Sequence, residues 1–244
     1  MTVLNTIIAK QLMVFKTEVD DLIDKKDLPK DDAIFNVLRD YIKACKPILY
    51  DGNSYADSWE KEAKKRGLSH SVNTPEALKA VLFPKHLELF KELKVMTEQE
   101  IKARLDLDLE DYVKRVQIEG RVLSDLILNH IIPSAVNYQN ELLKNVKTLK
   151  LLFPEDYSLH AKSQLELITS ISNHLRILKS EMDIMVLARK KANVVDNLQN
   201  KAIMYCNSVR ARFEDIRYHC DKLELIVDDK LWTIPKYREL LYTK

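Results

Sequence analysis

Glycine is unusually scarce in this chain of 244 residues, where it occurs only at Gly52, Gly67 and Gly120. A loop that cradles phosphate groups needs clustered glycines, because its backbone N–H groups must close around the ligand. Tight β-hairpins also favour residues that accept a positive φ angle. The scarcity therefore disfavours a phosphate-binding loop and a turn-rich β fold, and it favours a chain of long helices.

The composition is that of a folded helical protein, with 46% hydrophobic and 31% charged residues. The chain contains 39 Lys and Arg residues and 37 Asp and Glu residues, which gives a net charge of +2. Since there is no long basic block and no apolar run of membrane-spanning length, we expect neither nucleic acid nor a membrane as a partner. The N-terminus lacks the features of a signal peptide, and the three cysteines are few and odd in number, so we expect a cytoplasmic protein.

Apolar residues recur at steps of three and four through most of the chain, which predicts amphipathic helices. One such pattern covers residues 3–24. A second begins at a Thr-x-x-Glu capping box, Thr97 to Glu100, and continues as far as Ile131. We interpret Pro133 as a kink within one long helix. Its apolar face is expected to resume at Val136, Asn140, Leu143 and Val146.

Spacing is most regular over residues 165–185 and 195–223, where the steps average about 3.5 residues, as in helices that pack lengthwise. We expect the turn between these helices near Arg189 to Asn193; no glycine or proline marks it, so a continuous helix is the alternative. Gly67 is expected to end a short helix.

These patterns together predict an all-α fold, in which short N-terminal helices precede a bundle of long antiparallel helices, one of them kinked at Pro133. The expected domains are a short-helix region over residues 1–96 and a long-helix bundle over residues 97–244.

Side chains that perform catalysis or bind metals form no recognised motif. None of the six histidines follows a glutamate by three positions, which disfavours a carboxylate-bridged di-metal bundle. Asp215 and His219, one helical turn apart, are the best remaining metal pair, but such pairs are common on charged helices without a metal. There is no Cys-x-x-Cys motif and no nucleophile in a strained elbow. The residues alone therefore indicate a helical scaffold or interaction domain, with no catalytic, cofactor-binding or metal-binding residue assigned.

Five stretches resemble the C-terminal region of type III glutamine synthetases and occur in the same order as in that family. They are YDGNSYADSW at 50–59, EAKKRGL at 62–68, TPEALK at 74–79, NHIIPSAVNYQ at 129–139 and VDDKLWTIPKYRELL at 227–241. Residues 2–8 are similar to the segment that directly follows the catalytic region of the family. Under this resemblance, we expect Met1 to stand at a cut within a longer parent sequence.

The resemblance implies a part of an enzyme that makes glutamine from glutamate and ammonia, using ATP and magnesium or manganese, in ring-shaped oligomers. Because the family's catalytic residues lie on an upstream barrel, it implies no cofactor in this chain and no activity of the chain alone. The implied role is a C-terminal structural or oligomerisation domain. Its partners would be the catalytic region, adjoining residues 1–96, and neighbouring subunits of a homo-oligomer.

Large side chains in the resembling stretches are candidate docking positions, because they carry much contact area. These candidates are Tyr55, Trp59, Pro133, Tyr138, Trp232 and Tyr237. Packing within the domain explains each of them at least as well. The alternative function is a free-standing helical bundle that acts as a scaffold or a regulatory interaction protein. An exposed apolar stripe would favour either binding role over a self-sufficient bundle.

Overall fold

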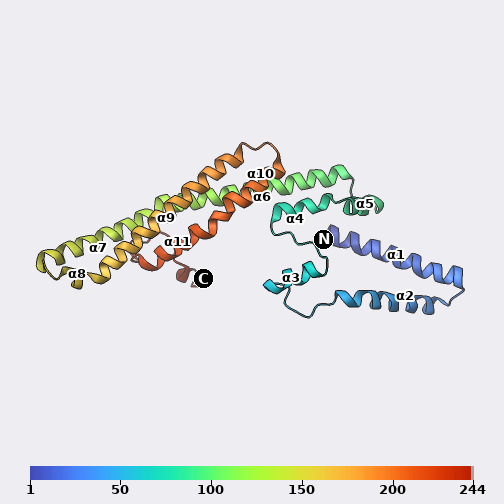
Figure 1. The fold of residues 1–244 in the computed structure, drawn as a ribbon. Coiled ribbons are helices and arrows are strands. Elements are labelled where there is room, and N and C mark those ends of the chain that lie inside the picture. Colours follow the sequence, from blue (N-terminus) through green and yellow to red (C-terminus); the bar gives the residue numbers. More distant parts are fainter. Residues whose placement is uncertain (243–244) are drawn as a thin grey trace. The chain divides into compact units, whose positions relative to one another are not determined.

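The computed structural model describes residues 1–242, and these residues form helices joined by loops, with no strand among them (Figure 1). The predicted all-α class is confirmed. The chain divides into two compact units, Met1–Leu107 and the residues from Asp108 onward. This division falls inside α6 (Glu98–Leu126), which begins, as predicted, at the capping box of Thr97 and Glu100. Glu100 Oε2 accepts from the Thr97 backbone N–H at 2.7 Å, and the Glu100 N–H donates to Thr97 Oγ1 at 3.3 Å.

The first unit is built on an antiparallel pair of helices, α1 (Thr2–Lys26) and α2 (Lys30–Cys45) (Figure 1). Val19, Ala33 and Val37 are buried between them. α1 extends over 25 residues and agrees with the pattern predicted for residues 3–24. The other helical elements of this unit are shorter: η1 (Lys46–Ile48), α3 (Asp57–Lys65), α4 (Thr74–Lys79), η2 (Ala80–Leu82) and α5 (Pro84–Glu92).

Gly67 ends α3 as predicted. Its φ angle is +73°, in the left-handed region that glycine adopts without steric cost. The Gly67 N–H donates to the Lys64 carbonyl at 3.1 Å, and the Leu68 N–H donates to the Ala63 carbonyl at 2.9 Å. This pair of bonds is a Schellman motif, which satisfies carbonyls that the end of a helix would otherwise leave unpaired.

The second unit packs three long helical segments, α7 (Ile132–Leu152), α9 (Lys162–Asn193) and α11 (Phe213–Ile226), and α9 contacts both of the others (Figure 1). The faces predicted over residues 165–185 and 195–223 supply its core, which includes Ile171, Leu178, Met182, Met185, Tyr205, Val209, Ile216 and Leu223. The remaining elements are η3 (Ile127–Ile131), α8 (Tyr157–His160), α10 (Leu198–Met204), η4 (Tyr205–Val209), η5 (Arg210–Arg212) and α12 (Tyr237–Leu240).

The turn between α9 and α10 lies at residues 194–197, slightly later than the predicted Arg189–Asn193. Asn193 stays helical because its side chain is held from two directions. Its Oδ1 accepts from the Tyr205 hydroxyl at 2.5 Å and from Gln117 Nε2 at 3.0 Å. The chain then re-enters a helix at Asn197, whose side chain accepts from the Asn200 N–H at 2.9 Å and acts as the N-cap.

The irregularity predicted at Pro133 is a π-helical turn, η3, which ends at Ile131, two positions before the proline. Pro133 has no N–H to donate to the preceding turn, and a π turn accommodates that gap by holding one residue more than an α turn. The expected continuation of the apolar face was wrong, because Val136 and Leu143 are 38% and 46% exposed. Ala135 is buried instead, and Tyr138 is half-buried.

Gly120 sits in α6 where a Cβ atom would meet the Phe213 ring and Val209 at 3.7 Å, which is ordinary van der Waals contact. We therefore expect Gly120→Ala to raise the free energy of unfolding by about 0.5–1 kcal/mol, because alanine loses less backbone entropy in a helix. Chemical denaturation measures this. Gly67→Ala is the matched control, and its positive φ predicts a loss of about 1–2 kcal/mol. A destabilised Gly120→Ala variant would contradict the packing described.

Candidate functional site

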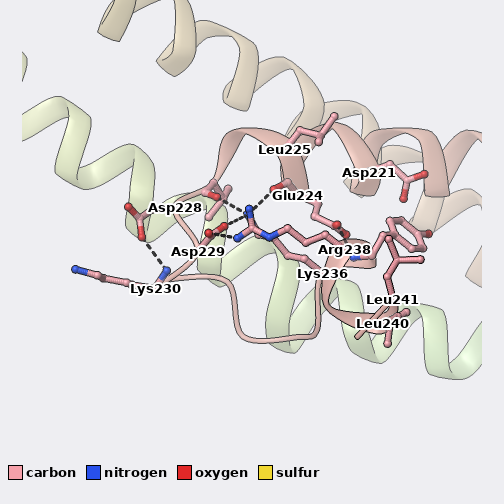
Figure 2. Close-up of a pocket in the computed structure, with 12 residues that line it drawn as sticks. Asp221, Glu224, Leu225, Asp228, Asp229, Lys230, Lys236, Arg238, Leu240 and Leu241 are labelled. Carbon is pink, nitrogen blue, oxygen red and sulfur yellow. Dashed lines mark hydrogen bonds and ion pairs between the residues drawn. The ribbon is translucent and has the colours of Figure 1, made fainter. Parts of the chain in front are cut away.

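The segment that follows α11, residues 228–241, which we call the tail, folds back onto the end of α11 and is held there by Lys236 (Figure 2). The Lys236 side chain is only 9% exposed. Its ammonium group donates to the backbone carbonyls of Glu224 at 2.7 Å and Val227 at 2.9 Å. These carbonyls belong to the last turn of α11 and its following residue, where a helix leaves acceptors unpaired and where a positive charge is favourable. Lys236 thus caps α11 from a distant point in the sequence.

A carboxylate completes this arrangement, which we call the Lys236 clamp: Lys236, Asp229 and Arg238, with the α11 carbonyls. Asp229 Oδ1 lies 2.7 Å from the Lys236 ammonium, and its other oxygen pairs with Arg238. The hydrogen bond from Lys236, followed by that from Arg238, holds the pKa of Asp229 below its usual value. Both basic residues therefore keep an ionised partner near neutral pH.

Further contacts fix the tail on each side of the clamp. The Tyr237 N–H donates to Glu224 Oε1 at 2.9 Å. The Trp232 ring is buried and lies beneath the Lys236 ammonium, 5.8 Å from ring centroid to nitrogen, as in a cation–π contact. A hydrogen bond of 2.9 Å joins Thr233 Oγ1 to His130 Nδ1 in η3. The tail therefore ties the end of α11 to the π-helical turn.

An open hollow of about 1040 Å³ lies beside the clamp (Figure 2). Its lining combines charged residues, such as Asp221 and Glu224, with aliphatic ones, such as Leu225, Leu240 and Leu241. The described lining residues include no serine, cysteine or histidine that could act as a nucleophile or proton shuttle. Several of the charges are already neutralised within the clamp.

The six predicted docking residues do not form one surface within either unit. Tyr55 is almost fully exposed, whereas Trp59 is half-buried and packs on Tyr50 with ring centroids 4.5 Å apart. In the second unit, Pro133 and Tyr237 are exposed, Tyr138 is half-buried and Trp232 is buried. Only Trp232 and Tyr237 come together, at the Lys236 clamp. Sequence reasoning did not single out Lys236, since a lysine is normally expected at the surface.

The histidine of the Asp215–His219 pair, for which the sequence predicted no metal role, has a different partner. His219 Nδ1 lies 2.8 Å from His174 Nδ1, which joins α11 to α9, while Asp215 is exposed. Within residues 1–242, no group of three or more His, Cys, Asp or Glu side chains is placed to hold a metal ion. Burial, together with the positive charges of His219 and Lys222, lowers the pKa of His174. The pair is thus a hydrogen-bonded contact between helices.

None of the helices within residues 1–242 combines the length and the apolar character needed to cross a membrane.

Comparison with known proteins relates the chain to one enzyme family. Residues 33–150 match the family model described as glutamine synthetase C-terminal domain. A glutamine synthetase of Bacteroides fragilis is 41% identical over 245 aligned residues, which cover 100% of this chain and 34% of that protein. A type-3 glutamine synthetase of Dictyostelium discoideum is 29% identical, covering 99% of this chain and 33% of that protein. The chain thus spans about a third of the length of these relatives.

We expect Lys236→Met to release the tail, because it removes the donor to the Glu224 and Val227 carbonyls and leaves Asp229 with Arg238 as its remaining ion-pair partner. The free energy of local opening should fall by about 1.5–3 kcal/mol, the range for hydrogen bonds to a charged group. Amide hydrogen exchange over residues 228–241 measures this free energy of opening, and exchange should be faster in the variant. Lys230→Met, which changes an exposed lysine on the same tail, should leave exchange unchanged. Equal effects of the two substitutions would contradict the clamp.

We expect the second unit to lose stability as the pH falls from about 7 to about 5. The pKa of His174 is lowered in the folded state, so the unfolded chain binds more protons as the pH passes below the ordinary value of 6.5. Carboxyl groups such as Asp229, whose pKa values are also lowered, change the free energy of unfolding only in more acidic solution. Urea unfolding across this range should show a flatter pH profile for His174→Gln. His160→Gln, at an exposed site, should retain the original slope.

Proposed function

We propose that this chain serves as the C-terminal helical domain of a glutamine synthetase, because residues 33–150 match the family model of that domain and the whole chain aligns with such enzymes. The observation that carries the proposal is the 41% identity to the Bacteroides fragilis enzyme across the full chain. The complete enzyme would join ammonia to glutamate and form glutamine. Since the chain covers about a third of its relatives, the remaining two-thirds would provide the reaction site.

In this proposal, ATP and magnesium or manganese belong to the catalytic region, and this chain contributes structure and contacts. Residues 1–96 adjoin the catalytic region, and residues 97–244 form a helical bundle that contacts neighbouring subunits of a homo-oligomer. Among the six candidate docking residues, Tyr55, Pro133 and Tyr237 have the exposure that an intermolecular contact requires. A cytoplasmic location fits the three cysteines, all of which are unpaired.

A free-standing dimer formed through the heptad-like seams has less support. Those seams are buried within one chain, as Ile171, Leu178 and Ile216 show. Large apolar side chains are exposed elsewhere, notably on α1 and α2, and they favour a binding role over a self-sufficient bundle.

The test is a chimera in which this chain replaces the matching third of the Bacteroides fragilis enzyme. We expect the chimera to form glutamine and to assemble to the size of the parent enzyme, as measured by a glutamine assay and by sedimentation. The parent enzyme truncated before this third is the control, and it should lose assembly or activity. A chimera that remains folded yet neither assembles nor forms glutamine would contradict the proposal.

A further inference from the structure

The first half of α1 carries a row of large apolar side chains that face solvent. Leu4, Ile8 and Leu12, which we call the α1 stripe, are 56%, 48% and 62% exposed. Their four-residue spacing places them along one side of the helix. Ile7 beside them is 50% exposed. Single exposed apolar residues need no explanation, but an aligned row on one helix marks a contact surface.

The α1 stripe continues the side of α1 that packs against α2. In the second half of α1, Phe15, Leu22 and Ile23 pack around the buried Val19 and the core shared with α2. Steps of three and four residues connect this side to Leu12, Ile8 and Leu4. One continuous apolar side is therefore covered in its second half and uncovered in its first half.

The neighbouring groups on α1 are already paired within the chain. Lys10 forms an ion pair with Glu92 of α5, and Lys16 forms one with Asp20. Thr6 is buried, and its hydroxyl donates to the Thr2 carbonyl at 2.8 Å. Since the nearby cations have partners, the α1 stripe requires a complementary surface that is apolar and needs no charge of its own.

We infer that the α1 stripe packs against the part of a glutamine synthetase that this chain does not match. This inference rests on the proposed function. The aligned Bacteroides fragilis enzyme includes a counterpart of all of α1, and the matched family is a C-terminal domain, so in that relative a long preceding chain leads into the counterpart of α1. The uncovered half of α1 is the half next to this junction. A covalently joined neighbour is present at high effective concentration, which favours it as the occupant.

The experiment uses the chimera described above and two substitutions matched in exposure on the same helix. Ile8→Gln changes the α1 stripe, where Ile8 is 48% exposed, and Met13→Gln changes a residue that is 49% exposed on a different side. Carbene labelling of side chains should fall about fivefold at Leu4, Ile8 and Leu12 when the isolated chain becomes part of the chimera, as half-exposed residues become buried. Ile8→Gln should impair assembly several-fold, whereas Met13→Gln should not.

Each other outcome overturns the inference in a distinguishable way. If the unsubstituted chimera is active and assembled but Ile8→Gln has no effect, the α1 stripe inference fails and the proposed function stands. If the chimera itself neither assembles nor forms glutamine, the proposed function fails, and the inference fails with it. If the isolated chain dimerises and Ile8→Gln abolishes the dimer, the occupant is a second copy. If Ile8→Gln unfolds the isolated chain, Ile8 belongs to the core.

Discussion

The apolar seam along α9 is the interaction on which the second unit depends. Ile171, Leu178 and Met182 are buried where α9 meets α7 and α11. The Tyr205 hydroxyl, which is buried in this part of the core, is paired with Asn193 and Gln117. That pairing matters because a buried polar group without a partner costs more than its hydrogen bond contributes. The Lys236 clamp adds hydrogen bonds to backbone carbonyls at the C-terminal end of α11, beyond the apolar seam.

Periodicity alone predicted the long helices and most of the buried faces, because a side chain's place on a helix follows from its position in the repeat. Local chemistry also identified helix ends where the partners lie within a few residues, as at Thr97 and Gly67. The predicted turn after α9 was early by a few residues. The end of that helix depends on Tyr205 and Gln117, which are distant in sequence from Asn193.

The candidate site was less predictable, because its central residue acts through tertiary contacts. Nothing local distinguishes Lys236 from the other lysines until the tail folds back onto α11. Trp232 was predicted as a docking residue because of its large contact area. In the structure its ring is buried within the chain, next to the Lys236 ammonium. The His174–His219 contact likewise joins two helices that no local spacing relates. Resemblance identified the stretch that contains the tail, but not how the tail is held.

The π turn at Ile127–Ile131 affects how this chain should be aligned with its relatives. A π turn holds one residue more than an α turn, so a single-codon insertion can create it while the helices on either side keep their geometry. A relative with an uninterrupted α-helix here would carry one residue fewer. A gapless alignment would then pair residues whose side chains point about 100° apart around the helix axis throughout α7. Apparent substitutions along α7 would then reflect a length change upstream, and the hydrogen bond of His130 to the tail gives a fixed point for placing the gap.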